Sequence, residues 1–316
     1  MKRFISIMLV LILALSLTAC GGSTKMTMGT GGSAGTYYAY GTVLGQFIKE
    51  KTGISVTAVN SEGSAANIQS INAGDYNMAT VQSDVLAYAW EGTRSFEKDG
   101  AIQSFRVMAG LYAEAVQLIT MDPAIKSVAD LKGKNVSIGA KGSGVYFNAI
   151  DVLGAAGLAE TDIKAHYLSF DDSTDGLKDG KIDAAFIVAG APTPAITELC
   201  TTNSAYLVPI DGDIAAKLIN AEGSFYTAYT IPAGTYDKQD KDVTTITVKA
   251  TMIVSADLSE DDVYKMTAAI FDNIDSISHA KAAELSLENA TQGMAAPFHA
   301  GAAKYFKEKG IEVSVK

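Results

Sequence analysis

The sequence contains few of the residues on which metal sites and nucleophilic catalysis depend. Its 316 residues include two cysteines and three histidines, His166, His279 and His299. No close set of His, Cys, Asp or Glu has the spacing of metal ligands. A P-loop is also missing, because Val145 stands where that motif places its lysine. We therefore expect no enzyme, no metal and no cofactor; His166 and His279 are interpreted as structural, and the role of His299 stays open.

Arginine and net positive charge are scarce as well. The chain has a formal charge of −10, which becomes about −12 without Lys2 and Arg3. This net negative charge disfavours nucleic acid as a partner and electrostatic binding to anionic lipid. Apart from Arg3 only Arg94 and Arg106 occur, so a bidentate guanidinium clamp for a carboxylate has two candidates. We expect Arg94 to be exposed in a polar loop and Arg106 to begin a strand, and leave open whether either touches a ligand.

The first twenty residues have the pattern of a lipoprotein signal peptide. Two basic residues precede the apolar run 4–17, which ends in a small-residue sequence before Cys20. We expect residues 1–20 to be the signal, Cys20 to be lipidated, and 21–25 to be a flexible tether. A plain membrane anchor and an ordinary secretory signal are the alternatives, but the run is short for a membrane span. The expected location is extracytoplasmic, lipid-anchored to a bacterial cytoplasmic membrane, with Cys200 a structural thiol.

The remaining chain alternates short apolar runs with amphipathic stretches, which predicts an α/β fold. Roughly 295 residues exceed what one hydrophobic core usually takes, so two lobes are expected. No low-complexity linker divides them, which suggests that the chain crosses between the lobes more than once. We predict lobe I from 26–112 and 231–316, and lobe II from 113–230. The β-prone passage 105–120 is interpreted as two strands, with the crossing near 112–114.

Two glycine-rich turns each join a predicted strand to a predicted helix. The first spans 29–35, before a helix that begins near Thr36, and the second spans 139–144, before a helix at 146–156. The first N–H groups of a helix lack partners within it and lie at the positive end of its dipole, so each turn is a candidate anion site. Turns of this kind also exist only to pack a helix on a sheet. Because one lies in each predicted lobe, we expect both to face a common cleft and to hold a carboxylate.

Hydroxyl groups and an aromatic wall complete the predicted site, since arginine is scarce. The candidate ligand-binding residues are Gly31, Gly32, Ser33, Gly35, Thr36, Tyr37, Tyr38, Ser61, Ser64, Gln82, Ser83, Gly142, Ser143, Gly144, Val145 and Thr193.

With these turns the chain resembles the TAXI family, the solute receptors of one branch of tripartite ATP-independent periplasmic (TRAP) transporters. The segments that carry the resemblance are 29–38, 61–67, 81–85, 142–144, 179–184, 190–193, 231–236 and 297–302. It extends over nearly the whole mature chain and implies a two-lobed, type II-like periplasmic-binding-protein fold with the ligand cleft between the lobes. It also implies delivery of a small carboxylate, glutamate- or glutamine-like or a dicarboxylate, to a permease driven by an ion gradient. Ala39 and Val145 depart from the proline and threonine of many relatives, and the second removes a hydroxyl from the edge of the site.

Two other hypotheses remain beside a transport receptor, which we expect to be a monomer. The first is a binding module that docks on a membrane sensor instead of a permease. The second is a surface enzyme or adhesin, which the scarcity of catalytic residues disfavours.

Overall fold

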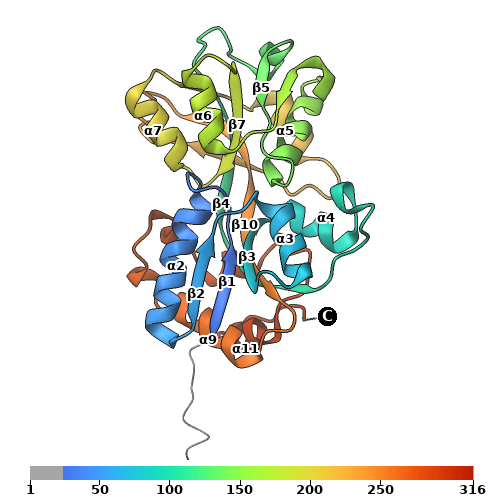
Figure 1. Cartoon of the computed structure of the whole chain (residues 1–316), viewed down its shortest axis with the longest axis vertical. Helices are drawn as coiled ribbons and strands as arrows, with labels where there is room; N and C mark the ends of the chain where they lie inside the picture. Colours follow the sequence, from blue (N-terminus) through green and yellow to red (C-terminus); the bar gives the residue numbers. More distant parts are fainter. Residues whose placement is uncertain (1–23, 316) are drawn as a thin grey trace, which may run out of the picture.

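The computed structural model describes residues 24–315, and in it strands and helices alternate as predicted (Figure 1). The strands β1, β2 and β3 with helices α2, α3 and α4 form one lobe, and β5 and β7 with α5, α6 and α7 form the other. The predicted signal and the lipidation of Cys20 lie outside the described residues. Lys25, predicted to end the tether, is the first residue of β1.

The strands are β1 (Lys25–Gly29), β2 (Ser55–Val59), β3 (Met78–Gln82), β4 (Phe105–Thr120), β5 (Asn135–Ser137), β6 (Lys164–His166), β7 (Ala184–Ala189), β8 (Tyr206–Val208), β9 (Thr227–Ile231) and β10 (Val243–Ser255). The α-helices are α2 (Thr36–Thr52), α3 (Ser64–Ala73), α4 (Ser83–Glu91), α5 (Gly144–Ala155), α6 (Phe170–Lys178), α7 (Pro194–Thr202), α8 (Gly212–Ile219), α9 (Glu260–Phe271), α10 (Leu287–Thr291) and α11 (Ala300–Glu308). The short 3-10 helices are η2 (Arg94–Phe96), η3 (Val128–Leu131), η4 (Glu160–Asp162), η5 (Ile274–Ser276) and η6 (Ala280–Glu284).

The strands are connected in the order β2-β1-β3-β10-β4-β7-β5-β6, with β8 on β4 and β9 on β10. β1 pairs in parallel with β2 and β3, and β5 pairs in parallel with β6 and β7. The carboxyl ends of parallel strands meet at one edge of a sheet, where ligand crevices of open α/β sheets lie. Each lobe therefore has one such edge, and the turns that lead into α2 and α5 follow β1 and β5.

β4 and β10 run through both lobes (Figure 1). β4 is one strand of 16 residues, so the prediction of two strands over 105–120 is wrong. Across the predicted break, Ala113 pairs with Lys249 and Glu114 with Val248 of β10, and from Ala115 onward β4 also pairs with β7. β4 therefore has β10 as its backbone partner before the crossing and β7 after it. Because its backbone groups stay paired in this way, the strand continues between the lobes without a turn.

The hydrophobic cores separate along the same two strands. Phe105–Tyr112 and the residues of β10 from Ala250 onward pack in the core of the first lobe, whereas Val116, Ile246 and Val248 pack in the second. Ile231 and Tyr236 also belong to a second-lobe cluster. The division at 113 and 230 stays a prediction, and we propose that the return crossing lies on β10 rather than at 231.

Cys200 is buried in this second-lobe cluster, where burial raises the pKa of its thiol. Among residues 24–315, the structure contains no helix that is both long and apolar enough to span a bilayer.

Candidate functional site

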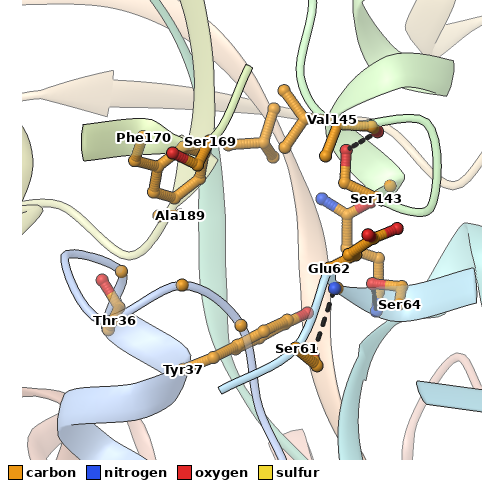
Figure 2. Close-up of a pocket in the computed structure, with 18 of the residues that line it drawn as sticks. Thr36, Tyr37, Ser61, Glu62, Ser64, Ser143, Val145, Ser169, Phe170 and Ala189 are labelled. Atoms are coloured by element: carbon orange, nitrogen blue, oxygen red, sulfur yellow. Dashed lines mark hydrogen bonds between the residues drawn. The ribbon is translucent and has the colours of Figure 1, made fainter. Parts of the chain in front are cut away.

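A cavity of about 280 Å³ lies between the two lobes (Figure 2). Figure 2 shows Thr36 and Tyr37 approaching it from α2, and Phe170 from the opposite lobe. Pockets for drug-sized molecules occupy about 300–1,000 Å³, so this cavity suits a smaller solute. It is lined by Gly31, Gly32, Gly35, Thr36, Tyr37, Ser61, Glu62, Gly63, Ser64, Gln82, Glu114, Ala140, Ser143, Gly144, Val145, Leu168, Ser169, Phe170, Val188 and Ala189.

The first lobe contributes the N-terminus of α2. Its N-cap is Gly35, in an extended conformation (φ −100°, ψ 157°), and no side chain of residues 24–315 caps the helix. The Thr36 hydroxyl instead donates to the carbonyl of Gly190 in the second lobe, at 2.8 Å. The turn before the helix requires glycine at Gly29, where a Cβ would lie 2.4 Å from the ring of Tyr76. The first amides of α2 therefore have no capping partner where the helix meets the cavity.

The second lobe contributes the N-terminus of α5 in the same manner. Its N-cap is Ser143, whose hydroxyl donates to the carbonyl of Ala140 at 2.6 Å and does not cap the helix. Gly139 adopts φ 82°, a conformation that favours glycine, and lets the chain turn from β5 toward the helix. Both glycine-rich turns thus present an uncapped helix end to the same cavity.

Helices α3 and α4 meet the cavity differently. The amides of Ala65 and Ala66 in α3 donate to the carbonyl of Gly142, at 3.1 and 3.2 Å, so a second-lobe oxygen occupies this helix end. Gln82 is the N-cap of α4 and is 2% exposed. Its Oε1 is buried without a hydrogen-bond partner among the described residues, and a ligand donor in the cavity would satisfy it.

Two carboxyl groups line the cavity. Glu62 is exposed in the turn before α3, whereas Glu114 of β4 is 1% exposed. Glu114 accepts a hydrogen bond of 2.5 Å from the hydroxyl of Tyr37. Burial raises the pKa of Glu114 to about 8 despite this hydrogen bond, which opposes the shift. No lysine, arginine or histidine is among the described lining residues.

Direct contacts join the lobes around the cavity. The amide of Ala195 in α7 donates to the carbonyl of Ala34 at 3.1 Å, beside the bond between Thr36 and Gly190. On the other side, Arg94 forms two hydrogen bonds with Asp151 of α5, at 2.9 and 3.3 Å. The lobes are therefore closed over the cavity. Arg94 is exposed, as predicted, but it begins the 3-10 helix η2 instead of lying in a loop, and neither it nor Arg106 lines the cavity.

Most of the predicted site residues are brought together in this cavity, and five are not. The predicted residues that line it are Gly31, Gly32, Gly35, Thr36, Tyr37, Ser61, Ser64, Gln82, Ser143, Gly144 and Val145. Those that do not line it are Ser33, Tyr38, Ser83, Gly142 and Thr193.

The five excluded residues have identifiable contacts or positions. Ser33 donates to Asp171 across the lobes at 3.3 Å, and Gly142 accepts from α3 as described. The Ser83 hydroxyl accepts from the amide of Lys249 at 3.2 Å, and Tyr38 is half-buried on α2. Thr193 is buried, and its Oγ1 donates to Gly190 and accepts from Gln117. Some polar residues of the turns thus line the cavity, and others form hydrogen bonds beside it.

Nine further residues line the cavity that the sequence does not predict: Glu62, Gly63, Glu114, Ala140, Leu168, Ser169, Phe170, Val188 and Ala189. Glu62 and Gly63 lie in segment 61–67, one of the segments that carry the family resemblance, so that resemblance is enough to indicate them. Phe170 follows β6 just as the other site residues follow their strands, so the position of the β6–α6 turn indicated it. Glu114 has no such signal, since it lies inside a continuous strand.

Gly31, Ser33 and Gly35 also have the spacing of a hydrolase nucleophile motif. The Ser33 hydroxyl is exposed and directed to Asp171, and no histidine is among the lining residues of the described chain. His299 caps α11, where its Nδ1 accepts from the amide of Gly301 at 3.2 Å. Among the described residues, the Ser33 hydroxyl is thus bonded to a carboxylate and not to the histidine base that such a nucleophile uses.

Comparison with known proteins gives the family. A model of the NMT1-like family matches residues 28–310. The chain belongs to the NMT1-like family. This match includes every cavity residue, so the site lies within the part of the chain that the family shares.

Solved structures show the same two-lobed fold. PhnD1 from Prochlorococcus marinus, in complex with methylphosphonate, is 12% identical over 91% of this chain and 96% of its own, with a TM-score of 0.55. The alkanesulfonate-binding protein SsuA from Xanthomonas axonopodis pv. citri, bound to MOPS, is 15% identical over 90% and 91%, with a TM-score of 0.50. A binding protein component of an ABC phosphonate transporter from Pseudomonas aeruginosa is 14% identical over 84% and 79%, with a TM-score of 0.50. This NMT1-like protein has the predicted fold, that of the type II periplasmic binding proteins.

Proposed function

We propose that this NMT1-like protein is an extracytoplasmic receptor that captures a small carboxylate between its lobes and delivers it to a membrane permease. The observation that supports this best is the pair of uncapped helix ends, α2 from one lobe and α5 from the other, at one closed cavity. Backbone N–H groups at helix N-termini bind anions through hydrogen bonds and the helix dipole. A ligand that bridges both ends would favour the closed arrangement of the lobes.

The free energy of binding needs more than the helix dipoles. One helix end contributes about 0.3–1 kcal/mol at an exposed site and up to ~2 kcal/mol when partly buried. A micromolar dissociation constant requires about 8.2 kcal/mol. Hydroxyls of Thr36, Ser61 and Ser64, the amide of Gln82 and the aromatic faces of Tyr37 and Phe170 are the groups available for the remainder.

The identity of the permease is the second part of the proposal. The resemblance to TAXI receptors favours a TRAP permease driven by an ion gradient, whereas one of the structural matches is named as a component of an ABC transporter. Lipid attachment at Cys20 would hold the receptor beside either permease. Of the two, we propose the TRAP permease, which is driven by an ion gradient.

Ligand screening tests the receptor function. Calorimetry and thermal-shift assays against amino acids, dicarboxylates, a sulfonate and a phosphonate are expected to give binding by at least one small carboxylate. No response to any carboxylate would contradict the proposal, and a response to the sulfonate or phosphonate alone would replace the ligand class. For the permease, uptake in cells should stop with an ionophore and continue after ATP depletion. The reverse result would indicate an ABC partner, and uptake unchanged by deletion of the receptor would favour a sensor.

A further inference from the structure

The charge on the cavity wall is one-sided. Glu62 and Glu114 supply carboxyl groups, and the described lining contains no basic side chain to oppose them. A second carboxylate on the ligand would find no cation there to pair with, and it would disfavour ionisation of the buried Glu114. A ligand held by one carboxylate at the helix ends therefore places a different group against the acidic wall.

Glu114 is the buried member of this pair and lies where β4 passes between the lobes. Its Oε2 accepts from the Tyr37 hydroxyl, and Tyr37 is its one side-chain hydrogen-bond partner among the described residues. The carboxylate has further acceptor capacity, because an ionised carboxyl group has about four lone-pair sites. A donor in the cavity can therefore reach a group that is buried but incompletely bonded.

The neighbours of Glu114 do not supply enough positive charge to keep it ionised at neutral pH. Four titratable side chains interact electrostatically with it: Tyr37 of α2, Asp84 of α4, Tyr112 of β4 and Lys281 of η6. Lys281 is the only cation of the four, and its Nζ is bonded to Glu284 at 2.6 Å. Burial and the charge of Asp84 raise the pKa of Glu114 to about 8, while Tyr37 and Lys281 oppose the rise. At neutral pH the empty cavity consequently holds Glu114 mainly as the neutral acid.

We propose that Glu114 selects ligands that carry an ammonium group beside their carboxylate, and that it releases a proton to solvent when such a ligand binds. This inference rests on the proposed receptor function and narrows its ligand class. The ligand enters with its ammonium already charged, the O–H bond of the Glu114 carboxyl breaks, and the resulting carboxylate accepts from the ammonium. One proton leaves for solvent, the ligand ammonium balances the charge of the Glu114 carboxylate, and the helix ends hold the ligand carboxylate.

Hydroxy and oxo acids of the same skeleton give the contrast. They hold the same carboxylate at the helix ends but bring no positive charge to Glu114, so the neutral carboxyl keeps its proton. An amine therefore gains a charge-assisted hydrogen bond that its hydroxy and oxo analogues lack. Between pH 5.5 and 7.5, the amine should also be the only member of each set whose affinity depends on pH.

Calorimetry with matched sets tests the inference. Three sets are used: alanine, lactate and pyruvate; glutamate, 2-hydroxyglutarate and 2-oxoglutarate; and leucine with its hydroxy and oxo analogues. Each is titrated into the full protein in two buffers of different ionisation enthalpy. For the best-binding set, the amine should bind at least tenfold tighter at pH 7.5 and release up to one proton. Its dissociation constant should fall about tenfold per unit from pH 5.5 to 7.5, and those of its analogues should stay within about threefold.

Glu114→Gln is the decisive variant, because the amide keeps the shape and can accept from Tyr37 but cannot release a proton. It should lose proton release and at least tenfold in amine affinity, while the affinity for the hydroxy acid changes less than threefold. Glu62→Gln, in the exposed turn before α3, should retain proton release. A merely structural role for Glu114 would weaken all three ligands alike and overturn the inference.

The remaining outcomes separate this inference from the receptor function. If the oxo and hydroxy acids bind as tightly as the amine, or the amine binds without proton release, the inference fails and the receptor function stands. If none of the nine compounds binds and the wider screen also finds no carboxylate, both fail.

Discussion

Gly144 of α5 lies against the side chain of Gln82 at the end of β3, in the opposite lobe. A Cβ at Gly144 would lie 1.5 Å from Gln82 Oε1 and 2.4 Å from Gln82 Cδ. Both residues line the cavity, and Gln82 is 2% exposed, so its side chain has little room to rotate away. Closure of the lobes in this arrangement thus depends on the absence of a side chain at Gly144.

Gly144→Ala is expected to weaken ligand binding at least tenfold, because the methyl group opposes the closed arrangement. The melting temperature of the empty protein should change little, since the open arrangement relieves the clash. X-ray scattering with saturating ligand should give a larger radius of gyration than for the parent. Adding Gln82→Ala makes room for the methyl group and should restore the compact radius; a double variant that stays expanded would contradict this explanation.

Gly32→Val is expected to raise the ligand dissociation constant at least tenfold. A Cβ at Gly32 would meet no protein atom within 4 Å, so valine projects toward the ligand space without displacing protein. The melting temperature without ligand should stay within about 2 °C of the parent value. Gly154→Ala in α5 is the matched control, because its Cβ also meets no atom and Gly154 is not among the lining residues. Equal affinity in Gly32→Val would place the ligand elsewhere.

Arg94→Asn tests the ion pair that joins the lobes outside the cavity. The side chains of Arg94 and Asp151 are 39% and 14% exposed, so solvent screening limits the pair to about 0.5–1 kcal/mol. Asparagine is chosen because Arg94 has φ 54°, a region that asparagine tolerates. The ligand dissociation constant should rise about two- to fivefold, whereas Lys132→Ala, which removes the ion pair with Asp162 inside the second lobe, should leave it unchanged. An unchanged affinity in Arg94→Asn would show that closure does not depend on this pair.

The contributions of Asp84 and Glu114 to the stability of the empty protein should fall as the pH rises from about 4 to 8. Burial raises the pKa of Asp84 to about 6 and that of Glu114 to about 8, from ordinary values of 3.8 and 4.5. Between those limits the folded protein binds more protons than the unfolded chain, so the free energy of unfolding decreases by at most ~1.4 kcal/mol per pH unit for each group. Urea denaturation at a series of pH values measures the slope. Glu114→Gln should flatten it between pH 6 and 8, and Asp84→Asn between pH 4 and 6.

His299→Ala should lower the free energy of unfolding by about 1 kcal/mol and leave ligand affinity unchanged. The ring caps α11 through Nδ1, while Nε2 donates to the carbonyl of Leu258 at 3.1 Å. Burial lowers the pKa of His299, so its contribution is complete above the ordinary value of 6.5 and is lost as the pH falls below it. His299→Asn should retain most of the stability, because asparagine is a good N-cap. A change in ligand affinity would mean that this end of the first lobe is coupled to the cavity.

Much of the fold was readable because its signals are local. The helix predicted from Thr36 ends at Gly53, which adopts φ 77°, and the strand, turn and helix order around both glycine-rich turns is as predicted. The prediction of two strands over 105–120 is wrong because hydrogen bonds to β10 and β7, and not local residue preference, keep this segment in one strand. The predicted site contained the turn residues and missed Glu114, because nothing local distinguishes a strand glutamate that faces a cavity from one that faces water.

The sequence by itself determined the α/β class, the two lobes and the turns at the helix ends, since apolar periodicity and glycine act over a few residues. Only the tertiary structure decided which polar residues share the cavity. Ser143 and Gly142 are adjacent, yet one lines the cavity and the other bonds to α3 in the opposite lobe. It also decided the electrostatics, because the protonation of Glu114 depends on burial and on Asp84 and Lys281, which are distant in sequence. Such effects arise from solvent exclusion and through-space charge, and neither is encoded in any short stretch of the chain.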